Sequence, residues 1–188
     1  MKKPATSRPS SPISKTRLEF LFDGIFAIAM TILVLEIKVP ELSDRHSVAE
    51  LGQALKHHAS VFISYLLSFF MLGMLWYHHN QHFRHLERIT KGILFLHLVQ
   101  LASAAFFPFC AALIGRYATN PLSMVVYIGC IITYRWASTA QWMLAKKSAS
   151  LSRDLTQAEY RHFRKRNWIV STLMTGMFLL YLFNTLTK

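Results

Sequence analysis

Apolar residues gather into five long blocks along this chain instead of alternating with polar ones. The blocks cover residues 20–35, 59–76, 92–114, 122–144 and 168–186. A helix needs about 20 mostly apolar residues to cross a bilayer, and each block reaches or approaches that length with its flanks. The blocks lack the strict alternation of barrel strands, which leaves helices as the spanning structure. The pattern predicts an all-α, polytopic bundle of five membrane helices, or six if one block divides into two, with no β-sheet.

The polar stretches between the blocks indicate where helices begin and end. The first helix is expected to stop at Pro40, because proline cannot continue a helix. Ser47 and Glu50 have the spacing of a capping box and predict the start of a long second helix that reaches about Arg88. A second capping-box spacing begins at Thr156. It predicts a basic, amphipathic stretch that leads into the last helix and lies at the inner membrane surface.

Basic residues are distributed unevenly around the blocks. The 188-residue chain has a net charge of +12, but its lysines and arginines cluster at block ends, which argues against a nucleic-acid-binding surface. With the N-terminus inside, fifteen of them lie in cytoplasmic segments and five in outer segments, which is the positive-inside asymmetry. Residues 1–16, rich in proline, serine and basic residues, are predicted to be a disordered cytoplasmic tail. Residues 17–188 are predicted to form a single transmembrane domain.

One acidic residue, Asp23, lies about one turn inside the first apolar block. A carboxylate in a membrane helix is costly and therefore points to a functional site. The alternative is a structural ion pair or a helix cap. Arg17 is close to Asp23 in sequence, and Arg135, alone in the middle of the fourth block, is a second possible partner.

The first block also carries a stripe of apolar residues with one hydroxyl. Ile28, Thr31, Ile32 and Leu35 follow the i, i+3, i+4, i+7 spacing and therefore share one helix face. Asp23 lies well off this stripe. Periodicity alone favours an ordinary helix-packing surface for these four residues.

A histidine cluster follows the second block. His78, His82 and His85 have a spacing that places them on one helix face, where they could bind zinc or iron in a membrane enzyme. Membrane hydroxylases use several histidine boxes, however, and this chain has one. The alternative is a set of polar residues at a cytoplasmic helix end. Because no Ser/His/Asp arrangement, P-loop or dinucleotide motif is present either, we expect neither an enzyme nor a bound metal.

The first helix resembles that of the bacterial relatives of the lysosomal potassium channel, transmembrane protein 175. That family's signature is Arg-x-x-x-Phe-Ser-Asp, then Gly, then an Ala/Ile-rich run that ends in Val-Leu-Glu-Ile-Lys-Val-Pro. This chain keeps these features as Arg17, Asp23, Gly24 and residues 26–40. It departs from the signature at Leu21 and Phe22, where the family has Phe-Ser. Residues 65–69, 76–79 and 107–109 resemble the family's second and third helices, so the resemblance covers residues 17 to about 117.

The resemblance implies a potassium channel in which the first helices of four identical subunits line a central pore. In the family, large apolar side chains on that helix form the constriction, and a nearby threonine ring helps to select potassium. Carried onto this sequence, the constriction is formed by Ile28, Ile32 and Leu35, and the selectivity residue is Thr31. A hydrophobic constriction can gate by dewetting, and hydroxyl dipoles can replace part of an ion's hydration shell. The carbonyl filter sequence TVGYG is absent, so selectivity is expected to be loose.

The other motif residues are expected to hold the subunit together on its cytoplasmic side. They are Arg17, Asp23, Gly24, Trp76, His78 and His79. The implied partners are further copies of the chain in a homotetramer, the lipid bilayer and potassium ions, with no nucleic acid and no cofactor. The implied location is a bacterial inner membrane, with the N-terminus in the cytoplasm. The family has six helices, whereas five would leave the C-terminus outside. A non-conducting membrane scaffold remains the other alternative.

Overall fold

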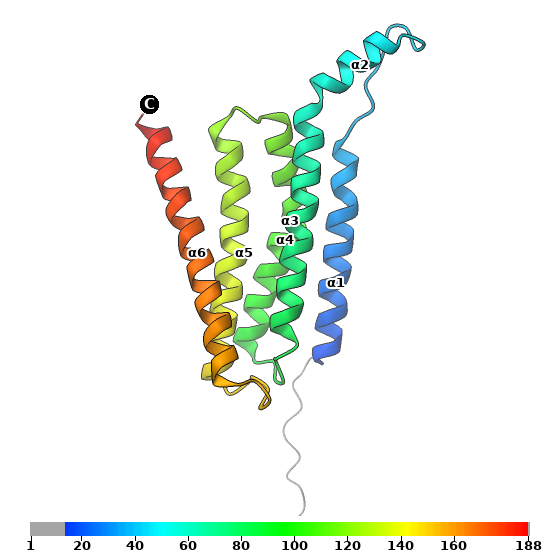
Figure 1. Ribbon diagram of the computed structural model, residues 1–188. Coiled ribbons are helices and arrows are strands. Elements are labelled where there is room, and N and C mark those ends of the chain that lie inside the picture. The colour runs from blue at the N-terminus through cyan, green and yellow to red at the C-terminus, as the bar shows by residue number, and fades with distance from the viewer. Residues whose placement is uncertain (1–13, 188) are drawn as a thin grey trace, which may run out of the picture.

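The computed structural model describes residues 14–187 and is built of helices (Figure 1). In chain order they are α1 (Lys15–Ile32), the 3₁₀ helix η1 (Leu33–Glu36), α2 (Val48–His57), α3 (Ala59–Phe83), α4 (Lys91–Arg116), α5 (Pro121–Lys147) and α6 (Gln157–Leu186). The described residues form no β-sheet, only an isolated bridge between Leu86 and Leu151. The predicted all-α helix bundle is confirmed.

Five of these helices lie side by side and alternate in direction (Figure 1). Four of them, counting α1 together with η1, are long and apolar enough to cross a membrane; the other three are α3, α4 and α6. The fifth, α5, has 27 residues but carries polar side chains in its middle, including Arg135 and Gln141, which are buried in the bundle. Because α4 and α6 run in the same direction, α5 has to return between them. Residues 14–187 therefore pass through the bundle five times, and the end of α6 lies opposite the start of α1 (Figure 1).

The predicted tail falls mostly outside the described residues. Ser14 caps α1 by accepting a hydrogen bond from the backbone N–H of Arg17, and Lys15 and Thr16 are already helical. The boundary at residue 16 is therefore two residues too late for the helix. The Lys15 ammonium donates to the backbone carbonyl of Arg84 at 3.0 Å, which ties the start of α1 to the end of α3.

The first helix ends earlier than predicted. α1 gives way to η1, and Ile37 then adopts an extended conformation (φ −82°, ψ 97°). The expected end at Pro40 is wrong because proline disfavours helical backbone at the residue before it, and β-branched Ile37 and Val39 add to that preference. The Arg116 guanidinium donates to the Glu36 carboxylate at 2.8 Å, which fixes η1 against the end of α4.

The helix α2 is separate from α3 and projects away from the bundle (Figure 1). Ser47 caps it as predicted, since its hydroxyl accepts from the backbone N–H of Glu50. The Glu50 carboxylate, however, accepts from the backbone N–H groups of Ser43 and Asp44 instead of that of Ser47, so the capping box is half formed. These two hydrogen bonds hold the pKa of Glu50 below its usual value. With ten residues, α2 is too short to be a sixth membrane crossing.

The prediction of one long helix from Ser47 to Arg88 is therefore right at its start but wrong in its continuity and at its end. The helix breaks at His58, and α3 ends at Phe83. After Phe83 the backbone pairs with the connection between α5 and α6, because Glu87 donates its N–H to the carbonyl of Ser150 at 2.8 Å. That pairing satisfies backbone groups which a continuing helix would have bonded internally.

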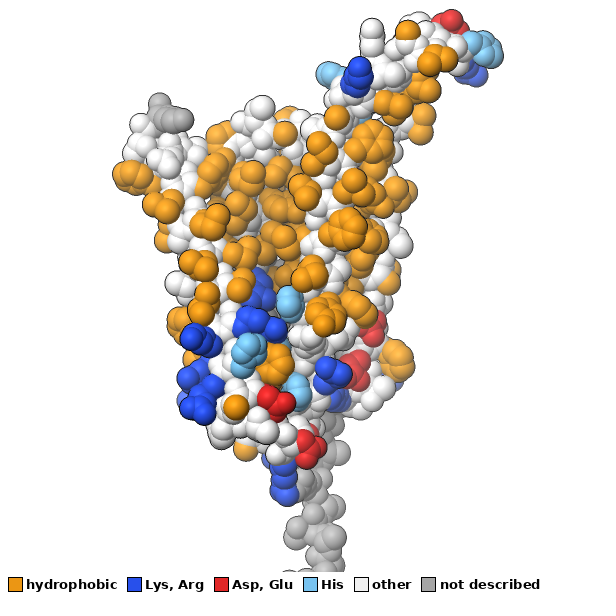
Figure 2. All heavy atoms as spheres, in the orientation of Figure 1, with side chains coloured by type: hydrophobic (Ala, Val, Ile, Leu, Met, Phe, Trp, Pro, Cys, Tyr) orange, Lys and Arg blue, Asp and Glu red, His pale blue; other side chains and the backbone are white. Residues whose placement is uncertain are grey.

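The start of α6 agrees with the sequence pattern. Thr156 and Glu159 form a complete capping box, in which the Thr156 hydroxyl accepts from the Glu159 N–H and the Glu159 carboxylate accepts from the Thr156 N–H. Two satisfied N–H groups stabilise the first turn of an otherwise exposed helix. Figure 2 shows apolar side chains over the middle of the bundle and charged side chains at the end where α1 begins and at the tip of α2.

Candidate functional site

The helix α1 buries one face against its own chain. Leu18, Phe22, Phe26, Ala29 and Leu33 recur every three or four residues, and all are buried. Most of them join a core cluster with residues of α3, α4 and α5. This spacing fixes the rotation of α1 about its own axis, and it thereby decides which residues face away from the subunit.

The opposite face of α1 is the predicted stripe. Ile28 is 59% exposed and Leu35 is 71% exposed, and Thr31 and Ile32 are exposed as well. Thr31 follows Phe22 by nine residues, which at about 100° per residue places it on the opposite side of the helix. Periodicity alone favoured an ordinary packing surface, but the stripe does not pack against its own chain. It faces either lipid or another molecule.

Small residues flank the stripe on the same exposed side. Gly24 and Ala27 are both exposed, and a Cβ added to Gly24 would meet no other atom within 4 Å. Small residues on a membrane helix allow a second helix to approach closely. The exposed face of α1 thus combines bulky apolar residues with room for close approach of neighbouring helices.

The Thr31 hydroxyl has its proton occupied within the helix. Its oxygen lies 2.9 Å from the carbonyl oxygens of Ala27 and Ile28, to which it donates. Because a hydroxyl has one proton and two lone pairs, this arrangement leaves oxygen lone pairs free to accept from water or to contact a cation. Thr31 thus contributes a hydroxyl group to a surface that is otherwise apolar.

The 3₁₀ turn changes the position of Leu35 relative to an ideal α-helix. In a 3₁₀ helix the side chains at i and i+3 lie almost directly above one another. Ile32 precedes η1 and Leu35 lies within it, so the turn places Leu35 along the helix axis from Ile32. The stripe is consequently straighter at its end than α-helical spacing predicts.

Asp23 bonds to a tryptophan, not to either predicted arginine. The Trp76 indole N–H of α3 donates to the Asp23 carboxylate at 2.7 Å. Among the described residues, neither Arg17 nor Arg135 lies within ion-pair distance of Asp23. The structural ion pair proposed for Asp23 is therefore replaced by a charge-assisted hydrogen bond that connects α1 to α3.

Phe22 occupies the position at which the family signature has serine. Its ring is fully buried and stacks on the His79 ring, with centroids 3.4 Å apart, and on Phe26 at 4.4 Å. The His79 Nδ1 lies 3.2 Å from the Gln100 side-chain oxygen, but its Nε2 has no hydrogen-bond partner. Position 22 therefore contributes aromatic stacking where a serine would contribute a hydroxyl group.

The histidine cluster does not form a metal site in the structure. The described residues contain no group of three His, Cys, Asp or Glu side chains arranged to hold a metal ion. α3 ends before His85, so the i, i+4, i+7 face does not continue to that residue. His82 instead packs against the rings of Trp142 and Phe163, at 5.1 and 5.5 Å, and its Nε2 lies 3.4 Å from the side-chain nitrogen of Asn167.

Sequence reasoning missed a polar chain buried between α3, α4 and α5. The Gln100 amide donates to the Gln141 side-chain oxygen at 3.1 Å, and the Gln141 amide donates to the Ile93 carbonyl. His97 is fully buried nearby. Hydrogen bonds connect His79, Gln100 and Gln141, whereas neither ring nitrogen of His97 has a hydrogen-bond partner. The sequence does contain a signal for these buried polar residues, because His97 and Gln100 lie three residues apart inside an apolar block.

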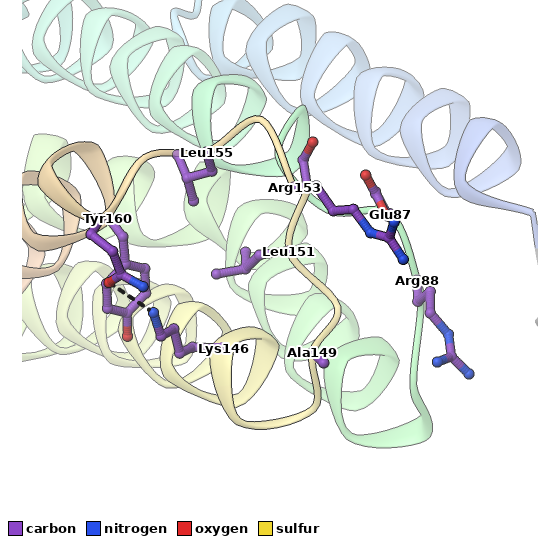
Figure 3. A pocket seen from close by; sticks show the side chains of 10 residues that line it. Glu87, Arg88, Lys146, Ala149, Leu151, Arg153, Leu155 and Tyr160 are labelled. Atoms are coloured by element: carbon purple, nitrogen blue, oxygen red, sulfur yellow. Dashed lines mark hydrogen bonds between the residues drawn. The ribbon is translucent and has the colours of Figure 1, made fainter.

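A hollow at the charged end of the bundle lies between the α3–α4 and α5–α6 connections (Figure 3). It has a volume of about 530 Å³ and mixes charges of both signs, with Glu87 beside Arg88 and Arg153. Figure 3 shows Lys146 turned toward Tyr160; its ammonium lies 4.4 Å from the centre of that ring and donates to the Gln157 side chain at 3.1 Å. This cation is already satisfied within the protein.

Comparison with known proteins agrees with this geometry. Residues 17–108 match the model of the family described as endosomal/lysosomal potassium channel TMEM175. A potassium channel of Chamaesiphon minutus is 31% identical over 156 residues, covering 77% of this chain and 76% of the relative. A potassium channel of Streptomyces collinus is 31% identical over 130 residues, covering 67% and 62%. The human endosomal/lysosomal proton channel TMEM175 is 30% identical, and the match spans 26% of its length.

Solved structures show the same fold. The crystal structure of a lysosomal potassium-selective channel TMEM175 homolog from Chamaesiphon minutus superimposes with a TM-score of 0.77 at 26% identity, covering 90% of this chain and 87% of that one. A variant of the potassium channel MtTMEM175 gives a TM-score of 0.66 at 20% identity, which concerns the fold alone. The family is one of channels, not of enzymes. From its motifs, its helix arrangement and these relatives, the chain belongs to the TMEM175 family of ion channels.

Proposed function

We propose that this chain is one subunit of a symmetric, loosely selective potassium channel, in which several α1 helices line a central pore. Ile28, Ile32 and Leu35 form its hydrophobic constriction, and Thr31 contributes a hydroxyl ring. The observation that carries the proposal is the exposed stripe, since it faces away from the subunit's own core. One five-helix chain with one such stripe cannot surround a pore, so identical copies have to meet around an axis. The relatives named potassium channels support potassium as the permeant ion. The number of copies that we propose is four.

The test is potassium flux into liposomes that contain the purified protein, with empty liposomes as the reference. A channel produces flux that depends on the protein and persists when the external salt is changed from chloride to gluconate. A non-conducting scaffold produces none. The proposal would be contradicted if liposomes that contain folded, oligomeric protein took up potassium no faster than empty liposomes.

Thr31→Val is expected to lower the preference for potassium over sodium, because it removes the hydroxyl and keeps the side-chain shape. A hydroxyl contact worth about 1 kcal/mol corresponds to about a fivefold change in the permeability ratio. Reversal potentials in bi-ionic conditions measure this ratio. Thr31→Ser is the matched control, since it keeps the hydroxyl and should stay near wild type; equal ratios in both variants would remove Thr31 from the selectivity site.

The orientation follows from the distribution of charge. The end of the bundle at which α1 begins also holds the basic α5–α6 connection and the start of α6. We infer that this end faces the cytoplasm of a bacterial cell and that the protein lies in the inner membrane, because positively charged residues are enriched on the cytoplasmic side.

The hydrogen bond between Asp23 and Trp76 holds the pore helix against the rest of the subunit. His79 adds to this support, since its ring stacks on that of Phe22. Arg17, Gly24 and His78 belong to the same end of the bundle, and we propose that they contribute to holding the subunit together there. A tilted α1 could not present its stripe to the other copies, so subunit structure and assembly are coupled.

Asp23→Ala is expected to lower the fraction of assembled oligomer and to destabilise the subunit by about 1–2 kcal/mol, as removal of an exposed, charge-assisted hydrogen bond would do. Size-exclusion chromatography and thermal unfolding in detergent measure both effects. Trp76→Phe and the double variant complete a cycle in which the two effects should not add. Glu19→Ala, one turn earlier on α1, is the control. Additive effects, or a fully assembled Asp23→Ala oligomer, would refute this role.

A further inference from the structure

A second surface, unrelated to the stripe on α1, lies between α5 and α6. We call it the α5–α6 groove; it has a volume of about 580 Å³. Its apolar walls are formed mainly by Trp136, Ala140, Met143, Leu144 and Trp168. α6 lies at the edge of the bundle, next to α5 (Figure 1), and all residues that line the groove belong to these two helices.

Two cations line the same groove. Lys147 is the last residue of α5, and Arg164 lies two turns into α6. Within the described part of the chain, neither head group has a hydrogen-bond or ion-pair partner; Arg164 lies only over the Tyr160 ring, 5.7 Å from its centre. No Asp or Glu lines the groove. The charge of both residues is thus uncompensated, at the end of an apolar surface.

The two tryptophans give the groove a defined wall. The rings of Trp136 and Trp168 meet edge to face, with centroids 5.4 Å apart, and the Trp136 indole N–H donates to the Thr175 hydroxyl at 3.0 Å. Tryptophan is enriched at the membrane–water interface, where its ring contacts acyl chains and its N–H stays near polar groups. Trp168 follows Arg164 by one helical turn, so the apolar wall and the cation adjoin each other on one face of α6.

The hollow on the other side of Tyr160 offers a useful contrast. There Glu87 opposes Arg88 and Arg153, and Lys146 is held by Gln157 (Figure 3). A polar site that carries charges of both signs suits no acyl chain. The α5–α6 groove differs, because its walls are apolar and its charges are of one sign.

We propose that the α5–α6 groove binds an anionic phospholipid of the inner leaflet. The acyl chain lies along Ala140, Met143 and the tryptophan wall, and the phosphate contacts Lys147 and Arg164. Basic pockets between membrane helices on the cytoplasmic side recognise anionic head groups, because the cations add local attraction to the apolar contact. The site is peripheral to the stripe on α1, and its occupancy does not depend on ion conduction.

The test uses quenching of tryptophan fluorescence in vesicles that contain the full-length protein. Phosphatidylglycerol or phosphatidylcholine with brominated acyl chains is added over the same series of mole fractions to a background of unbrominated phosphatidylcholine. Wild-type protein is expected to be quenched at a lower mole fraction of the anionic lipid than of the zwitterionic one. The double variant Trp136→Phe with Trp168→Phe is expected to lose most of this lipid-dependent signal, which assigns the signal to the groove.

The charge variants decide whether the groove itself selects the lipid. Lys147→Gln with Arg164→Gln is expected to weaken the preference for phosphatidylglycerol about tenfold. Arg161→Gln with Lys165→Gln is the matched control, since it removes the same charge from exposed positions of α6 that do not line the groove. The control should keep most of the preference. Equal losses in both variants would show general surface attraction and overturn the site.

A third variant tests the apolar half of the proposal. Ala140→Phe places a ring in the groove and is expected to reduce quenching by both brominated lipids. Circular dichroism and size-exclusion profiles verify that each variant is folded before it is compared; exposed helix positions tolerate such changes well. Unaltered quenching in a folded Ala140→Phe protein, or no preference for the anionic lipid in wild type, would also contradict the proposal.

Discussion

Ile28→Ala is expected to raise ion flux through reconstituted channels and to move the potassium-to-sodium permeability ratio toward one. Ile28 is exposed on the stripe, and its side chain is one of the large groups that would meet around the axis. Removing three carbons from each copy widens the constriction, which lets cations keep more of their hydration shell and weakens both dewetting and selection. Flux assays with matched potassium and sodium gradients measure both quantities.

The matched control for this variant is Ile63→Ala. Ile63 of α3 is 57% exposed, nearly the same as Ile28, but it lies outside α1. The substitution removes the same atoms from a surface that no pore is proposed to use, so flux and selectivity should stay near wild type. Unchanged permeability ratios in Ile28→Ala, or equal changes in both variants, would place the constriction elsewhere.

Phe22→Ala is expected to produce the largest loss of stability among the substitutions considered. The Phe22 ring is fully buried and contacts the rings of His79 and Phe26, so its removal leaves a cavity where α1 meets α3. Loss of a buried phenylalanine costs about 3–5 kcal/mol, which in a chain of this length lowers the Tm by roughly 10 °C. Thermal unfolding in detergent measures the shift.

Two further variants separate the cavity from other effects at this position. Phe20→Ala is the control, since Phe20 is 72% exposed and two residues away on the same helix. Phe22→Ser, which restores the residue of the family signature, returns a hydroxyl near His79 but leaves the same cavity. We expect it to be nearly as unstable as Phe22→Ala. A Phe22→Ser protein as stable as wild type would mean that the aromatic stack contributes little.

The bundle could be predicted from the sequence because membrane helices obey a strict length and hydropathy rule. Four apolar blocks became helices that are apolar enough to span, and the fifth became α5, whose polar residues are buried. Helix ends were predicted less well, since they depend on tertiary contacts. The pairing of Glu87 with Ser150, which accompanies the end of α3, joins residues that are far apart in sequence.

The stripe on α1 was predictable in composition but not in direction. The spacing of Ile28, Thr31, Ile32 and Leu35 defines a face, whereas the competing face with Phe22 and Phe26 is equally apolar. Only packing shows which one the subunit buries. The partner of Asp23 was missed for a similar reason, because sequence proximity and opposite charge suggested Arg17, while the fold brings Trp76 to it.

The departure at Phe22 changes the kind of contact that this motif position makes. The sequence shows a lost hydroxyl beside Asp23, which suggests a weakened polar network. The structure shows an aromatic stack at that place, with Gln100 and Gln141 continuing the polar contacts deeper in the bundle. These polar contacts depend on residues of α4 and α5 that no local motif includes.

If Thr31 faces a water-filled path for cations, a cysteine at that position can be modified from the water, and this modification is the most direct test of the proposed pore. The background replaces Cys110 and Cys130 with alanine, and Thr31→Cys is compared with Ile63→Cys after treatment with a positively charged methanethiosulfonate. We expect modification of Thr31→Cys to block potassium flux, while Ile63→Cys conducts as before. Undiminished flux through Thr31→Cys channels that mass spectrometry shows to be fully modified would contradict the proposed pore.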